Sequence, residues 1–136
     1  MGNVFCHLGN SVNLLPEIIN HYDDVPVAFY LDAHYSGSGT AIGYSEVPVL
    51  DEIASLRSRK QKDLIIVDDL RLFGTKGVCG HVGNEFYPPM EYDWRDITIS
   101  SILTAFGGAK TIYHEIFDDR LVIICNLSQK EKKLLE

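Results

Sequence analysis

Acidic side chains gather at two places where an apolar run of the sequence ends. Asp32 follows the run at residues 25–31, and Asp68 and Asp69 follow the run at residues 64–67. Short runs that are apolar throughout are typical of strands buried on both faces of a parallel sheet. Neighbouring parallel strands end at the same edge, about 5 Å apart. We therefore expect these three carboxylates to lie close together.

Three adjacent carboxylates repel one another unless a proton or a cation lies between them. Mg²⁺ and Mn²⁺ prefer oxygen ligands of this kind, so the sequence predicts a divalent-metal site formed by Asp32, Asp68 and Asp69. The alternative is that each Asp accepts hydrogen bonds from backbone N–H groups of its own turn, which is common for this residue. His34, Cys79 and His81 could extend such a cluster to a transition metal, although a single His after a strand is more often a hydrogen-bonded loop residue.

Predicted strands and helices alternate along the chain, and these elements must position the acidic side chains. The spacing predicts strands at 4–8, 25–33, 63–70, 111–117 and 120–127, and helices at 11–22, 48–57 and 93–106. Asn10 or Ser11 would cap the first helix, and Asp118-Asp119 would form the turn of a terminal hairpin. Residues 74–92 have no periodicity, which predicts a long loop or lid. This order predicts a doubly wound, Rossmann-like α/β fold, with a mostly parallel sheet of about five strands, a C-terminal antiparallel hairpin and helices on both faces.

Length and charge restrict the classes of function. At 136 residues, we expect one domain at residues 1–128 and a charged tail at 129–136. The net charge of −7 argues against nucleic-acid binding, and no apolar run is long enough to span a membrane. The three cysteines have no disulfide or zinc spacing, which favours reduced thiols in the cytoplasm. A basic cluster of four residues is interpreted as the solvated end of a helix: Arg57, Arg59, Lys60 and Lys62.

Five segments of the sequence, taken in order, resemble a known protein family. They are VFCHLGNS, FYLDAHYSG, PVLDEIASL, LIIVDDLRLFG and HEIFDDRLVIICN. Together they resemble the C-terminal two thirds of a class I S-adenosylmethionine-dependent methyltransferase, of the metal-dependent O-methyltransferase type that acts on catechols and macrolide sugars. The resemblance implies that Asp32, Asp68 and Asp69 hold Mg²⁺ or Mn²⁺, with a catalytic role for Asp32, and that Asn10 stands where the family contacts the adenine of the cofactor. In such enzymes the metal lowers the pKa of substrate hydroxyls and positions an oxygen for attack on the methyl group.

The sequence departs from the family on the cofactor side. It lacks the glycine-rich turn that holds the methionine part of S-adenosylmethionine and the acidic residue that holds its ribose. We therefore expect weak or no binding of this cofactor, and no methylation by the chain alone. Three interpretations remain: a fragment of an active metal-dependent methyltransferase acting on an unknown small molecule, a stand-alone metal-binding domain, or a catalytically inert interaction module.

The missing strands would also leave the strand at residues 25–33 at an edge of the sheet. An unpaired apolar edge favours association. We expect the segment VFCHL at residues 4–8 to pair with this strand, and the chain to form a homodimer that buries apolar surface near that end of the sheet.

Overall fold

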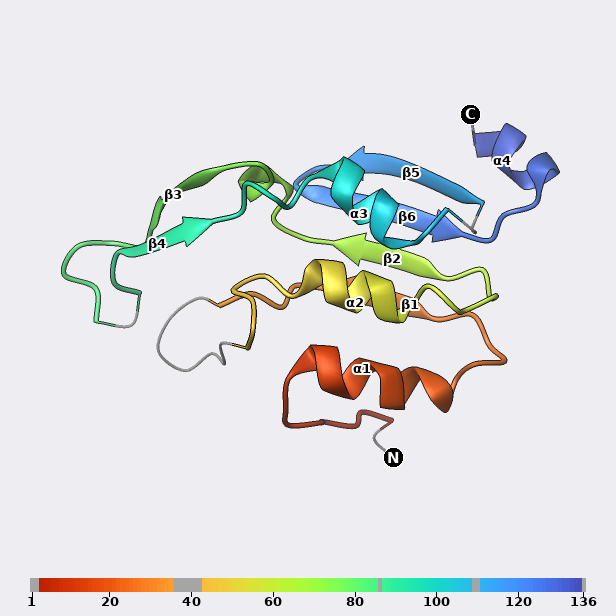
Figure 1. The fold of residues 1–136 in the computed structure, drawn as a ribbon, viewed down its shortest axis with the longest axis horizontal. Coiled ribbons are helices and arrows are strands. Elements are labelled where there is room, and N and C mark those ends of the chain that lie inside the picture. The colour runs from red at the N-terminus through yellow and green to blue at the C-terminus, as the bar shows by residue number, and fades with distance from the viewer. Residues whose placement is uncertain (1–2, 36–42, 86, 109–110, 136) are drawn as a thin grey trace.

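A computed structural model describes residues 3–35, 43–85, 87–108 and 111–135. Four strands form the main sheet, two more form a separate hairpin, and helices connect them (Figure 1). In chain order the elements are α1 (Ser11–Asn20), β1 (Ala28–Leu31), α2 (Val49–Ser55), β2 (Leu64–Val67), the 3₁₀ turn η1 (Leu70–Leu72), β3 (Lys76–Cys79), β4 (Met90–Asp93), α3 (Ile99–Ala105), β5 (Ile112–Phe117), β6 (Arg120–Cys125) and α4 (Gln129–Leu135). None of the described helices has both the length and the apolar character needed to cross a membrane.

The main sheet is mixed, with strand order β1-β2-β6-β5. Only β1 and β2 are parallel, whereas β2–β6 and β5–β6 are antiparallel. The prediction of a doubly wound, mostly parallel sheet of about five strands was therefore wrong. Parallel pairing needs a crossover connection, and α2, between β1 and β2, is the one crossover that joins parallel neighbours in the described sheet. After β2 the chain leaves the sheet, and it returns through α3 to the antiparallel hairpin β5–β6.

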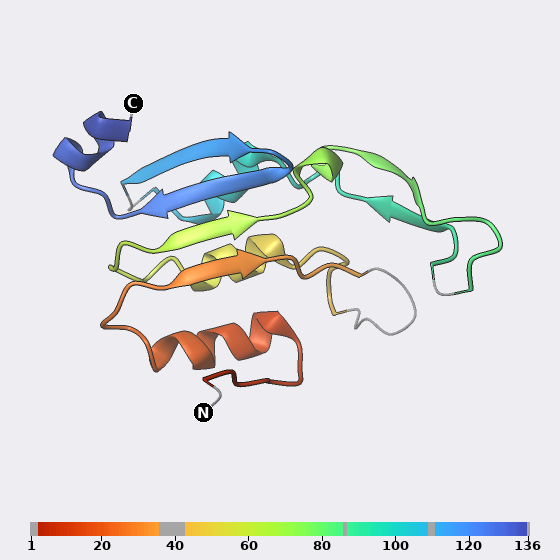
Figure 2. The ribbon, with the colours of Figure 1, turned by 180° about the vertical axis from the view of Figure 1, so that it is seen from behind.

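Residues 4–8 form no strand, so the predicted pairing of VFCHL with β1 was also wrong. In both ribbon views α1 lies along the outer side of β1, and the N-terminal segment runs on the far side of α1 (Figures 1 and 2). The helix therefore separates this segment from the strand. Val4, Phe5 and Leu8 are left exposed, and β1 is an edge strand of the described sheet.

Helices α2 and α3 lie on the same face of the sheet, so the prediction of helices on both faces was wrong; α1 lies beside the β1 edge (Figure 2). Helix α2 packs against α3 and α1 packs against α2, and the ribbon seen from behind shows the four strands in front of α2 and α3 (Figure 2). The core between the helices and the sheet includes Ile53, Ile65, Ile102 and Ile123, each fully buried. The opposite face of the sheet is covered by no described element.

Residues 74–92, predicted as a long loop, contain the antiparallel hairpin β3–β4. Lys76 pairs with Asp93 and Cys79 with Met90, and the hairpin projects beyond the ends of β1 and β2 (Figure 1). Gly80 has a φ of 92°, and a Cβ there would lie 2.1 Å from the carbonyl oxygen of Pro88, so this close turn requires glycine. Each strand is short and half-exposed, which explains why the sequence carries no clear period here.

Arg59 is buried, which corrects the interpretation of the basic cluster as a solvated helix end. Its Nε and Nη2 donate to the two carboxylate oxygens of Asp63 at 2.8 and 2.9 Å. Its remaining N–H groups donate to the backbone carbonyls of Tyr22 and Val25 at 3.0 and 2.8 Å. Because α2 ends at Ser55, Arg59 lies in the following loop and ties it to the connection between α1 and β1.

Candidate metal centre at the ends of β1 and β2

The parallel register of β1 and β2 determines which side chains meet beyond them. Leu31 pairs with Val67, so Asp32 and Asp68 follow at the same edge of the sheet. Asp32, His34 and Asp69 each offer a ligand atom within 4.8 Å of the others. A second group, formed by Asp68, Asp69 and Asp119, meets the same limit. Neither group contains both Asp32 and Asp68, so the structure divides the predicted set of three aspartates.

His34 is the member of the first group to which sequence reasoning gave little weight. Its Nδ1 lies 3.4 Å from Oδ2 of Asp69 and 3.8 Å from Oδ1 of Asp32. The indole of Trp94 packs against the imidazole edge to face, with ring centroids 5.4 Å apart. The sequence feature that could have identified His34 is the spacing Asp32-Ala33-His34, because alternate side chains of an extended chain project to the same side.

Asp69 owes its position to an unusual backbone conformation. Its φ of 61° and ψ of 35° are left-handed, a region that Asp tolerates better than most residues. One carboxylate oxygen, Oδ1, lies 2.6 Å from Nη1 of Arg71, while the other, Oδ2, faces His34. The following turn η1 is held from the β5–β6 hairpin, since Asp119 accepts from the backbone N–H of Leu70 at 2.9 Å and of Arg71 at 2.8 Å.

Asp68 is engaged on the other face of the sheet. The Tyr30 hydroxyl donates to Oδ2 of Asp68, and Nε of Arg120 lies 3.6 Å from Oδ1. The left-handed backbone of Asp69, beyond the end of β2, turns its carboxylate toward His34, whereas Asp68 contacts Tyr30. The two adjacent aspartates therefore have different partners.

The pKa values of Asp32 and Asp68 are shifted in opposite directions. Burial, together with the neighbouring charges of Asp69 and Asp68, raises the pKa of Asp32. Burial also acts to raise the pKa of Asp68, but the Tyr30 hydroxyl, the backbone N–H of Asp69 and the Arg120 guanidinium together lower it. Asp68 is thus already compensated by protein groups, whereas Asp32 carries a charge that a cation would stabilise.

A buried carboxyl lies beneath the first group. Glu52 is 2% exposed, burial raises its pKa, and its Oε2 has no hydrogen-bond partner among the residues that the structure describes. Glu52 lines a small cavity of about 10 Å³ together with five polar or aromatic residues of the site: Asp32, His34, Asp68, Asp69 and Trp94. That volume is close to the minimum for one water molecule. A buried carboxylate oxygen with no described partner, beside these side chains, fits a site that a bound water molecule or cation completes.

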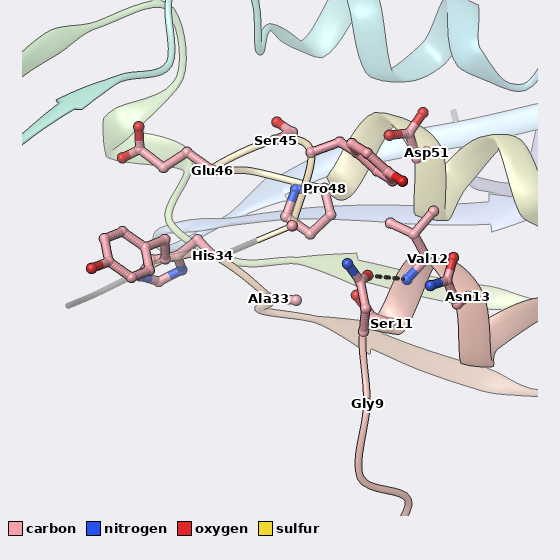
Figure 3. Close-up of a pocket in the computed structure, with 14 residues that line it drawn as sticks. Gly9, Ser11, Val12, Asn13, Ala33, His34, Ser45, Glu46, Pro48 and Asp51 are labelled. Carbon is pink, nitrogen blue, oxygen red and sulfur yellow. Dashed lines mark hydrogen bonds between the residues drawn. The ribbon is translucent and has the colours of Figure 1, made fainter. Parts of the chain in front are cut away.

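Asn10, the predicted cofactor contact, acts as the N-cap of α1. Its Oδ1 accepts from the backbone N–H of Val12 at 2.9 Å (Figure 3). The same residue lines a pocket of about 210 Å³, with the start of α1 on one side, His34 on another and residues 43–48 on a third (Figure 3). One side-chain oxygen of Asn10 is therefore used within the fold, although the residue borders a cavity next to the acidic group.

Cys79 and His81, the other suggested ligands, do not join either group of the described residues. Cys79 ends β3, where its thiol faces the carbonyl of Met90 at 3.7 Å, and the ring of His81 packs against Tyr87. A comparison of the chain with protein-family models, curated proteins and solved structures finds no match.

Proposed function

We propose that this chain is a cytoplasmic, methyltransferase-like α/β domain that binds a divalent cation through Asp32, His34 and Asp69. The observation that carries the proposal is the convergence of these three ligand atoms within 4.8 Å. Beside them lies Oε2 of Glu52, which has no partner in the described part of the chain. The sequence resemblance independently points to Asp32 and to the Asp68-Asp69 pair. The proposed ligand set replaces Asp68 with His34 because Tyr30 and Arg120 already engage Asp68.

The donor types indicate which ions to test. Two carboxylates and one imidazole suit Mn²⁺, Fe²⁺ or Zn²⁺ better than Mg²⁺, which favours an all-oxygen shell. The remaining positions of the ion would be open to water or to substrate hydroxyls, whose pKa a bound cation lowers. In the chain itself, Trp94 fixes the imidazole plane and Arg71 holds Asp69, so the ligands are positioned before the ion arrives.

Methyl transfer by this chain alone is not part of the proposal. The residues that the family uses for the methionine and ribose parts of S-adenosylmethionine have no counterpart in this sequence. Each directed hydrogen bond contributes about 1 kcal/mol, so losing several removes most of a micromolar affinity. We expect titration calorimetry with S-adenosylmethionine to give a dissociation constant above about 10 µM, and a tighter value would contradict this part of the proposal.

Metal binding is tested by thermal unfolding with and without Mn²⁺. With 1 mM Mn²⁺ and a dissociation constant near 10 µM, mass action stabilises the fold by about 2.7 kcal/mol. For a chain of this size that corresponds to a rise in Tm of roughly 8–10 °C. Mg²⁺ at the same concentration should give a smaller rise.

The variants Asp69→Asn and His34→Gln should lose the metal-dependent rise in Tm. The control is Asp118→Asn, because Asp118 is an exposed carboxylate near the site that belongs to neither group. Asn also tolerates its left-handed φ of 57°. Electron paramagnetic resonance of free Mn²⁺ counts bound ions directly. An unchanged Tm at millimolar Mn²⁺, or an equal rise in the Asp69→Asn protein, would refute the site.

A further inference from the structure

One face of the main sheet is apolar and carries no covering layer in the described part of the chain. Along β1, β2 and β6 the residues alternate between full burial under the helices and partial exposure on the other side. The exposed or partly exposed set consists of Ala28, Tyr30, Leu64, Ile66, Val122 and Ile124, to which β5 adds Tyr113, Glu115 and Phe117. We call this surface the bare face. Figure 2 views it directly and shows no helix across it.

The bare face has the composition of a protein interface. Its centre is the aliphatic quartet Leu64, Ile66, Val122 and Ile124, in which Leu64 pairs with Ile124 and Ile66 with Val122. Tyr30 flanks the quartet on β1, and Tyr113 and Glu115 flank it on β5. An aliphatic centre with tyrosines and few charges at its rim is typical of interfaces between proteins. Aliphatic patches of several hundred Å² are rarely left in water.

The charged groups at the rim are arranged so that the face complements itself. In the arrangement considered, a second copy is rotated by 180° about an axis parallel to the strands and midway between β2 and β6, so that the two bare faces meet. Because the strand order is β1-β2-β6-β5, β2 then faces β6 and β1 faces β5 of the other copy. Residues that pair across the sheet come opposite one another, so Tyr30 faces Glu115 and Arg120 faces Asp68 of the other copy. The Asp68 carboxylate therefore meets a guanidinium of the second copy.

We propose that the bare face is the contact surface of a homodimer in which two sheets pack face to face. Such sheets pack about 10 Å apart with interdigitating side chains. Four strands about 4.8 Å apart and four to six residues long cover roughly 350 Å² in plan. Two corrugated faces of this size bury about 1,000 Å², which is the lower end of specific interfaces. An interface of this area is typical of a weak, reversible complex, so we expect a dissociation constant in the micromolar range.

Sedimentation equilibrium between 5 and 500 µM tests the proposal. The mass should rise from the 15.3 kDa of one chain towards twice that value. Each copy carries a net charge of −7, so added NaCl should strengthen the association by screening the repulsion. A mass of one chain at 500 µM would overturn the proposal, whatever else binds the face.

Two variants locate the contact. Ile66→Lys and Val122→Lys place a charge at the centre of the bare face, and each should weaken the dimer at least tenfold. Thr104→Lys, on the exposed surface of α3, is the matched control and should leave the association unchanged. Circular dichroism and Tm of each variant check that the monomer is folded. A dimer that survives both central substitutions would refute this location.

Cysteine pairs test the two-fold arrangement without a loss of function. In a chain whose exposed Cys6 is changed to Ser, a thiol cross-linker that spans about 10 Å, the distance between packed sheets, should join the double variant Tyr30→Cys/Glu115→Cys into a covalent dimer. Each single variant should stay monomeric under the same treatment. Residues 30 and 115 lie on the outer strands of one sheet, roughly 14 Å apart, which is beyond the reach of this cross-linker within one chain. Cross-linking of the single variants at the same rate, or of neither protein, would refute the proposed axis.

Discussion

Replacing Arg59 with Met should destabilise this protein more than any surface substitution. The guanidinium is 1% exposed in its side chain, and the Asp63 carboxylate that it pairs with is equally buried. Removal of Arg59 leaves that carboxylate in the core without its counter-charge, and leaves the carbonyls of Tyr22 and Val25 without their donor. Breaking a buried ion pair by removing one partner costs about 3–5 kcal/mol. Domains of this size have only about 5–15 kcal/mol of stability.

The assay is urea unfolding followed by tryptophan fluorescence, which reports on the buried Trp94. We expect the midpoint to fall without a change in the m-value, and the Tm to fall by roughly 10–20 °C. The matched control is Arg57→Met. Arg57 also donates twice to one carbonyl, that of Ala105, but from an exposed position, so its loss should cost about 1 kcal/mol or less.

A double-mutant cycle separates the ion pair from the lost packing of the arginine stem. Asp63→Asn keeps an oxygen to accept from the backbone N–H of Val27, at 3.0 Å in the parent protein, but removes the charge. The double variant should therefore be at least 1 kcal/mol more stable than the sum of the single changes predicts. The reasoning fails if Arg59→Met costs no more than Arg57→Met, or if the two changes simply add.

Two further predictions concern hydrogen bonds at the ends of elements. Tyr30→Phe removes the hydroxyl that lowers the pKa of Asp68, and should cost about 1 kcal/mol at pH 7 in urea unfolding at a few micromolar protein. Because the folded pKa of Asp68 is depressed, its contribution to stability is present above about pH 4, the unfolded pKa, and is lost as the pH falls through the folded pKa. The two proteins should therefore converge in stability in acid, and a gap that widens there would contradict the assignment. Thr98→Ala removes the cap of α3, in which Thr98 Oγ1 accepts from the N–H of Ser101 at 3.0 Å and Ser101 Oγ accepts from the N–H of Thr98 at 2.8 Å. It should cost about 1–2 kcal/mol, while Ser100→Ala, on the exposed side, should stay within about 0.5 kcal/mol in the same assay.

The local elements were largely predictable, whereas the topology was not. The cap at Asn10, the crossover helix after Pro48 and the turn at Asp118-Asp119 each rest on a signal within a few residues, and the structure confirms all three. The place of residues 4–8 depends instead on where α1 packs, and α1 occupies the side of β1 that this segment was expected to reach. An apolar alternation shows that a segment can be a strand, but not which neighbour it has.

The same limit explains the candidate site. Adjacency in sequence suggested that Asp68 and Asp69 act together, but the two carboxylates have different partners. Asp68 is engaged by Tyr30 and Arg120, and Asp69 lies beside His34 because its backbone is left-handed. His34 joins the group because of Trp94 and Asp69, and neither contact has a local sequence signal. Arg59 was misjudged because a basic residue after a helix is usually solvated, and its burial follows from tertiary contacts with Asp63 and the α1–β1 connection.

The bonds that Asp119 makes to the turn after Asp69 link the candidate site to the end of the chain. The N–H groups of Leu70 and Arg71 are held by a residue about fifty positions later, so the left-handed turn at Asp69 has its full support only once the β5–β6 hairpin has docked. During synthesis these last strands emerge after all of the proposed ligands, and the site therefore forms late in folding. In the folded protein we expect opening of the hairpin and release of Asp69 to be coupled, because these two hydrogen bonds join them. A ligand that holds Asp69 should consequently slow amide hydrogen exchange along β5 and β6, although these strands supply none of the atoms that it touches.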